Sequence, residues 1–232
     1  MHFSQELADR FMRYVRIDTE ADPNSSSFPS SEKQKDLGRL LTQELIELGA
    51  SDVEMDAWGY VFATIPSNSP NQNLPTICFC SHMDTAPDCS GKDVKPILHR
   101  AWNGSPITLP DDTTQVITVE NQPYLSRKIG QDVITASGLT LLGADDKAGV
   151  TIIMELAKHL LTHSEIPHGK IRILFTPDEE VGRGVEHLDM NKLGADYGYT
   201  LDGGPLGEVE DETFSADAMT FTFTGVSAHP GY

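Results

Sequence analysis

The chain has 232 residues, of which 38% are apolar and 22% are charged, as in ordinary globular proteins. Its 35 acidic and 17 basic side chains leave a net charge of −18. Such a surface repels phosphate backbones and anionic lipids, which argues against binding to nucleic acid or to a membrane surface. The sequence has no apolar run of about 18 residues and no apolar signal region at its start. We therefore expect no membrane span and a cytoplasmic location.

Two helices are predicted at the start of the chain. Apolar residues recur every four positions from Phe3 to Val15, which indicates an amphipathic helix. After a polar loop, Ser31 and Gln34 have the spacing of a capping box. Leucines at helical spacing then run up to Gly49, a residue typical of helix ends.

Strands alternate with helices along the next part of the chain. Patterns typical of strands occur at 60–65, 76–80, 171–175 and 197–201. A buried helix is predicted directly after residues 143–149, and residues 86–135 are expected to form a long excursion with short strands. This alternation predicts an α/β sandwich around a mainly parallel sheet.

The three cysteines are expected to be free thiols. Cys78 and Cys80 flank one residue of a predicted strand and would point to the same face, a spacing that suits neither a zinc clamp nor a disulfide.

The pattern changes after Asp211. Residues 219–224 alternate with a period of two, as in a half-buried antiparallel strand. We place a domain change near Phe214, so that residues 1–213 form one domain and residues 214–232 begin another. The end of the chain directly after a strand and a turn suggests that the natural protein is longer.

Four patches rich in acids or histidine each follow a predicted strand or begin a helix. They are SHMD at 81–84, GADDKAG at 143–149, TPDEEVG at 176–182 and DGGP at 202–205. In open α/β sheets, sites form beyond the carboxyl ends of the strands, so these four loops are able to meet in one crevice.

The first two patches offer a histidine and several carboxylates. His82 is a candidate zinc ligand, and Asp84, two residues on, is placed to orient its imidazole. A loop histidine with a solvated Asp is the alternative. Asp145 and Asp146 begin a helix, where a carboxylate also stabilises the helix end. The small residues around the pair favour a metal-bridging role, because they permit close approach from both sides.

The last two patches add further acids. Glu179 and Glu180 are able to divide their roles, one binding a metal and the other acting as a base on water. A solvated turn is the alternative for this patch, and a glycine turn is the alternative for Asp202. Nitrogen and oxygen ligands without thiolate suit zinc, manganese or cobalt, whereas calcium seldom binds histidine. The sequence lacks the GxSxG, Walker A and GxGxxG motifs of other site types.

The segments SHMDTAPD, LLGADDKAG, FTPDEEVGRG and LDGGP resemble, in order and spacing, the motif series of the peptidase T (tripeptide aminopeptidase) family. That family is part of a clan of two-zinc peptidases and deacylases that includes aminoacylase and succinyl-diaminopimelate desuccinylase. The resemblance covers nearly the whole chain. It implies a three-layer α/β sandwich within residues 1–213, whose C-terminal portion lies beyond this chain. A smaller α+β lid domain would begin at residues 214–232, and relatives suggest homodimers built through such a lid.

The resemblance also implies roles for the first motifs. His82 would bind the first zinc ion, with Asp84 behind it and Asp202 completing the ligand set. Asp145, rather than Asp146, would bridge the two ions.

In the remaining motifs, Glu179 would be the general base and Glu180 a ligand of the second zinc ion. A further histidine ligand, far toward the C-terminus in the family, has no counterpart here, so this chain alone should hold the second metal weakly. His229 matches a lid histidine that reaches substrate, although a turn histidine before a proline explains it almost as well.

The expected function is removal of the N-terminal residue from short peptides, by resemblance tripeptides, with two Zn²⁺ ions or Co²⁺ or Mn²⁺ in their place. One alternative is another hydrolase of the clan: a dipeptidase, a carboxypeptidase or an N-acyl amino acid deacylase. A metal-binding but inactive fragment is the other alternative, because the distal histidine is absent.

Overall fold

The computed structural model describes residues 3–213, 215–217 and 219–231. The chain divides into one compact unit that ends at Asp202 and a second unit that begins at Gly203. All helices and strands of the described part of the chain lie before Asp202. The expected domain change at Phe214 falls on a residue outside the described ranges.

The prediction of a strand over residues 219–224 is wrong. These residues are exposed and form no strand in the described part of the chain. A strand is stabilised by the hydrogen-bonded ladder to a neighbouring strand, and the alternating pattern alone does not supply that neighbour.

A five-stranded mixed sheet forms the centre of the first unit, with the strand order β1-β2-β8-β3-β9. The strands are β1 (Ser51–Met55), β2 (Val61–Ile65), β3 (Ile77–His82), β8 (Ile171–Thr176) and β9 (Tyr197–Thr200). Strand β3 runs parallel to β8 and β9, whereas β2 runs antiparallel to β1 and β8. The α/β fold with a mixed sheet is confirmed, and parallel pairs make up two of the four pairings, because the β1–β2 hairpin adds an antiparallel edge.

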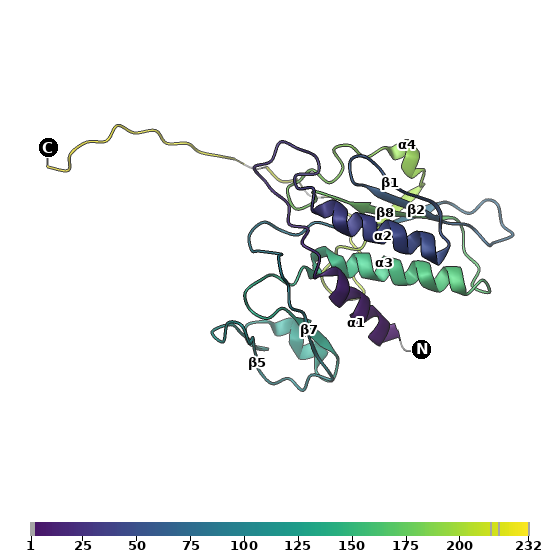
Figure 1. Cartoon of the computed structure of the whole chain (residues 1–232), viewed down its shortest axis with the longest axis horizontal. Coiled ribbons are helices and arrows are strands. Elements are labelled where there is room, and N and C mark those ends of the chain that lie inside the picture. Colours follow the sequence, from purple (N-terminus) through teal and green to yellow (C-terminus); the bar gives the residue numbers. More distant parts are fainter. Residues whose placement is uncertain (1–2, 214, 218, 232) are drawn as a thin grey trace. The chain divides into compact units, whose positions relative to one another are not determined.

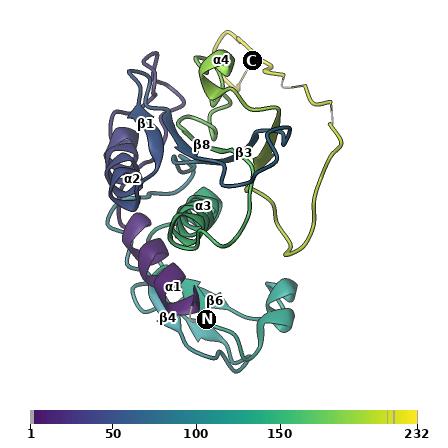
Figure 2. The same cartoon turned by 90° about the vertical axis from the view of Figure 1, so that its right-hand side faces the viewer.

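Helices cover both faces of this sheet. On one side lie α1 (Phe3–Tyr14), α2 (Gln34–Leu48) and α3 (Ala144–Thr162), and on the other lies the short α4 (Met190–Leu193) (Figures 1 and 2). The larger apolar core fills the space between the sheet and α2 and α3. A second core, which includes Phe62, Leu174 and Leu193, packs under α4. No helix among the described residues has both the length and the apolar composition that crossing a membrane requires.

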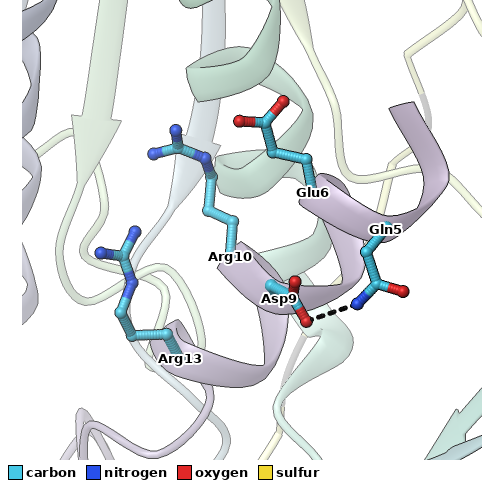
Figure 3. Close-up of a pocket in the computed structure, with 5 residues that line it drawn as sticks. All are labelled: Gln5, Glu6, Asp9, Arg10 and Arg13. Atoms are coloured by element: carbon cyan, nitrogen blue, oxygen red, sulfur yellow. Dashed lines mark hydrogen bonds between the residues drawn. The ribbon is translucent and has the colours of Figure 1, made fainter. Parts of the chain in front are cut away.

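Helices α1, α2 and α3 are joined by a partly buried network of charges. The Arg10 guanidinium lies 2.5 Å from Glu155 of α3 and also pairs with Glu44 of α2. The Tyr14 hydroxyl donates to the same Glu44 carboxylate at 2.6 Å. Beside this network, α1 borders a hollow of about 580 Å³, lined by Gln5, Glu6, Asp9, Arg10 and Arg13 (Figure 3). None of the residues predicted for the site lines it.

The start of α2 differs from the predicted capping box. The helix begins at Gln34, and the residue before it, Lys33, makes no side-chain cap. The Ser31 hydroxyl donates instead to the Glu20 carbonyl, and the Gln34 side chain is buried. The predicted end is confirmed, because Gly49 stops α2 in the left-handed conformation with φ of 86°.

The segment between β3 and α3 is a long excursion with short strands, as expected. It holds two small antiparallel sheets and a short 3₁₀ helix, Pro123–Lys128. The first sheet pairs β4 (Ile97–His99) with β7 (Val133–Thr135), and the second pairs β5 (Ile107–Thr108) with β6 (Val116–Ile117).

We expect one fast-reacting thiol among the three cysteines of this chain. All three cysteines are free: Cys78 is buried, Cys80 is half-buried and Cys89 is exposed. Burial raises the pKa of Cys78 to about 11, against the charge of Arg172, and burial raises the pKa of Cys80 to about 12. Their thiolates are therefore scarce at pH 8, and the thiolate is the nucleophile. Thiol titration at pH 8 should modify Cys89 quickly and the other two only after denaturation, and Cys89→Ser should abolish the fast phase. Fast modification of Cys78 or Cys80 before denaturation would contradict this.

Candidate metal centre

The four predicted patches meet at one edge of the sheet. Strands β3, β8 and β9 are parallel, so the residues after His82, Thr176 and Thr200 emerge at the same edge. Helix α3 packs against β3 and brings the start of its own motif to this edge. The sequence-based expectation that these loops converge is therefore confirmed for the chain up to Asp202.

One imidazole lies at the centre of the cluster. The Nε2 atom of His82 is 2.8 Å from Asp145 Oδ1 and 3.8 Å from both Asp202 Oδ1 and Glu179 Oε2. The side chain of His82 is 1% exposed, whereas that of Asp145 is 72% exposed. The ligand atoms of His82, Asp145 and Asp202 all lie within 4.8 Å of one another. The imidazole of His82 is thus buried, and the carboxylates of Asp145, Asp202 and Glu179 lie on its solvent-exposed side.

This spacing fits a metal ion. Zinc takes nitrogen and oxygen ligands at about 2.0–2.2 Å, which places two tetrahedral ligand atoms roughly 3.4 Å apart. The 3.8 Å from Nε2 to Asp202 Oδ1 lies near that value, and the 2.8 Å from Nε2 to Asp145 Oδ1 is a direct hydrogen bond that a metal ion would replace. One imidazole with carboxylates suits zinc, manganese or cobalt.

Asp84 anchors both the histidine and the acidic turn. It is fully buried, and its Oδ1 lies 3.3 Å from Nδ1 of His82. Its two carboxylate oxygens also accept the backbone N–H groups of Glu179 and Glu180, each at 3.1 Å. With Asp84 at Nδ1, the other ring nitrogen, Nε2, faces the cluster and is hydrogen-bonded to Asp145. The link from Asp84 to the backbone of the acidic turn was not foreseen from the sequence.

The adjacent acids Asp145 and Asp146 have different surroundings. Asp145 faces His82 at the open side of the cluster. Asp146 is buried and accepts hydrogen bonds from the Ser81 hydroxyl, the His82 N–H and the Gly149 N–H. Asp146 therefore joins the first turns of α3 to the end of β3. This geometry is consistent with the choice of Asp145, rather than Asp146, as the metal-facing acid.

The side chains of Glu179 and Glu180 have different surroundings. The Glu179 side chain is half exposed and has one oxygen 3.8 Å from the histidine. Glu180 is not part of the closely spaced group formed by His82, Asp145 and Asp202. Burial raises the pKa of Glu180, and the charge of Asp145 raises it further. His229 lies in the second unit, where its Nδ1 accepts the N–H of Gly231 in a turn, and the structure does not place it relative to the cluster.

Negative charge is in excess in this cluster. Burial alone would lower the pKa of His82, but the hydrogen bond and charge of Asp84, with the charges of Asp146 and Asp202, raise it to about 10. The pKa of Asp202 is raised to about 6, chiefly by burial. The charge of His82 lowers this pKa, whereas the charge of Asp145 raises it. The carboxylates thus favour an added positive charge, which a proton or a metal ion supplies.

Asp178 is a residue whose place the sequence did not indicate. Asp178 precedes Glu179 and Glu180 in the patch at 176–182, yet it is fully buried and hydrogen-bonded to Ser30 and Gln34. Ser30 lies 148 positions earlier in the chain. No local pattern in the sequence connects residues so far apart.

The chain is similar to peptidases both by a family model and by whole-sequence comparison. Residues 109–218 match the family model described as peptidase family M20/M25/M40. The chain is 48% identical over 231 residues to a peptidase T of Bacillus cereus, covering 100% of this chain and 56% of that protein. It is also 48% identical over 227 residues to a peptidase T of Bacillus mycoides, covering 98% of this chain and 55% of that one. The chain thus spans about half the length of the curated relatives it matches.

Two solved structures resemble the fold. The aminopeptidase PepT of Bacillus cereus aligns with a TM-score of 0.61 at 27% identity, covering 87% of this chain and 44% of that one. A tripeptidase of Staphylococcus aureus aligns with a TM-score of 0.60 at 27% identity, with the same coverage.

Proposed function

We propose that this chain, a relative of peptidase T within peptidase family M20/M25/M40, is the metal-binding part of an aminopeptidase that removes the N-terminal residue from tripeptides. The observation that carries the proposal is the convergence of His82, Asp145 and Asp202 at the carboxyl edge of the sheet. The resemblance to proteins named peptidase T along the whole chain supports the substrate class.

His82, Asp145 and Asp202 would hold the first zinc ion, with Asp145 shared between two ions and Glu180 given to the second. A further ligand of the second ion would come from outside this chain. Zinc at this place lowers the pKa of water and polarises a carbonyl group, and cobalt or manganese would offer similar chemistry.

Glu179 is the proposed general base. Its carboxylate takes a proton from water as the water oxygen bonds to the scissile carbonyl carbon. The same carboxyl group then passes the proton to the amine nitrogen as the C–N bond breaks. Glu179 suits this role because its side chain is half exposed beside the cluster while its backbone is held by Asp84. Asp84 fixes His82 and contacts no substrate in this scheme.

We further propose a cytoplasmic enzyme that forms a homodimer through a lid domain beginning near residue 214, and that His229 of that domain contacts the peptide. The net charge of −18 supports a small-peptide substrate over nucleic acid or anionic lipid.

A hydrolysis assay on the zinc-loaded, full-length protein tests the function. We expect a free tripeptide to lose its N-terminal residue and the same peptide with an acetylated N-terminus to remain intact. Cleavage of the blocked peptide alone would indicate an acylase. Cleavage of neither peptide by protein with bound zinc would favour the inactive metal-binding alternative or a different substrate.

A further inference from the structure

The turn that carries Glu179 and Glu180 is held by a buried carboxylate that does not face the metal cluster. Asp178 is 0% exposed and accepts three hydrogen bonds. They come from the Ser30 N–H at 2.6 Å, the Ser30 hydroxyl at 2.5 Å and the Gln34 side-chain amide at 2.6 Å. A buried carboxylate is costly unless it is paired in this way, so the three donors stabilise one orientation of Asp178.

Gln34 contacts the turn twice. Its Nε2 donates to the Asp178 carboxylate, and its Oε1 accepts the backbone N–H of Asp178 at 3.0 Å. Gln34 is itself fully buried at the first position of α2. The Gln34 amide therefore hydrogen-bonds both the side chain and the backbone of Asp178. This pairing requires a donor and an acceptor in the same side chain, which an amide supplies.

The backbone of Asp178 lies in the left-handed region, with φ of 56°. Asp and Asn occupy this region more readily than other L-residues with side chains, so Asp178 suits the conformation of this turn. The next two N–H groups, those of Glu179 and Glu180, donate to Asp84. The turn closes with the Gly182 N–H on the Glu179 carbonyl at 2.8 Å. Two sets of hydrogen bonds therefore hold this turn. Asp84 accepts from the backbone at Glu179 and Glu180, and Ser30 and Gln34 bind the preceding residue, Asp178.

We propose that Ser30, Gln34 and Asp178 are positioning residues that set the direction of Glu179 and Glu180, so that the start of α2 and the residues just before it affect the rate of the chemical step. This inference rests on the proposed function of Glu179 as base. A displacement of about 1 Å in a reacting group is able to cost as much as 10²-fold in rate, so a modest shift of the turn is measurable in kcat.

Gln34→Glu is the informative variant in the zinc-loaded, full-length protein. It keeps the shape of residue 34 but sets a second carboxylate against Asp178, which should displace the turn. We expect kcat to fall by about tenfold or more, with KM changed by less than about threefold, because the base moves while substrate contacts stay. Asp178→Asn should also lower kcat.

The double variant, Gln34→Glu with Asp178→Asn, exchanges the amide and the carboxylate. The carboxylate at position 34 is then able to accept both from the side-chain amide at position 178 and from the backbone N–H of that residue, so kcat should recover most of the loss. Gln43→Glu is the matched control, since Gln43 is exposed on the same helix and its amide donates to Glu47 at 2.8 Å. It introduces the same charge beside a carboxylate and should leave kcat unchanged.

A second measurement separates this inference from the proposed function. The visible absorption of the cobalt-loaded protein reports ligand geometry, and it should change in Gln34→Glu, return in the double variant and stay unchanged in Gln43→Glu. A Gln34→Glu variant that is less stable but keeps both kcat and the cobalt spectrum would overturn the positioning role. If the parent protein hydrolyses no peptide, the proposed function fails, and the cobalt spectra still decide whether the segment positions the turn.

Discussion

Replacement of Glu179 by glutamine should lower kcat for tripeptide hydrolysis by about 10²–10⁴-fold in the full-length protein, the usual contribution of general acid–base catalysis. Glutamine keeps the size of the side chain, and its backbone N–H still donates a hydrogen bond to Asp84. Its side-chain amide, however, is unable to take a proton. The candidate ligand atoms of His82, Asp145 and Asp202, which lie within 4.8 Å of one another, are left in place by the substitution. Metal content and KM should therefore change little.

The measurement is steady-state kinetics with metal analysis of the same samples. Glu165→Gln, at an exposed position, controls for the loss of one acid and should behave as the parent protein. Glu180→Gln should differ from both by losing part of the bound metal. If Glu179→Gln retained kcat within about twofold, a role as proton carrier would be excluded, because this chemistry requires an ionisable group.

The fold was largely predictable because its signals are local. The helices at Phe3–Tyr14 and Ala144–Thr162 follow from apolar spacing, and β8 follows from the apolar-rich run IRILF at 171–175. The strand β1 was missed, since SDVEM has only two apolar residues, Val53 and Met55, and its pairing with β2 supplies its stability. The strand expected at 219–224 failed for the opposite reason: its pattern is clear, but no paired strand stabilises it in the described chain.

The candidate site was predictable in part. Strand ends and small residues indicated where His82, Asp145 and Asp202 would gather, and the parallel pairing of β3, β8 and β9 brings their ends together. The contacts that support these residues were not predictable. Asp178 depends on Ser30 and Gln34, which lie far away in sequence, and a contact of that kind is decided by the packing of α2 against the sheet.

Gly149 is the last of the small residues in the motif at 143–149, and Gly149→Ala should damage both stability and activity. In the interior of a helix, alanine is normally favoured over glycine by about 1 kcal/mol. Here a Cβ atom would lie 2.2 Å from the Leu201 carbonyl oxygen, 2.5 Å from Asp146 Oδ1 and 2.6 Å from Ser81 Oγ. Such overlaps force α3 away from the ends of β3 and β9, so we expect a net loss of about 1–3 kcal/mol in the free energy of unfolding.

The same overlap should reach the candidate metal centre, because Leu201 directly precedes Asp202 and Asp146 directly follows Asp145. A shift of about 1 Å at these positions justifies an expected loss of about 10²-fold in kcat/KM together with weaker metal binding. Gly198→Ala in β9 is the matched control, since a Cβ atom there meets no atom within 4 Å. Denaturant unfolding, metal titration and kinetics on both variants test the argument. Since helix propensity and steric overlap act in opposite directions at Gly149, a stabilised and fully active Gly149→Ala protein would show that α3 does not approach the ends of β3 and β9 this closely.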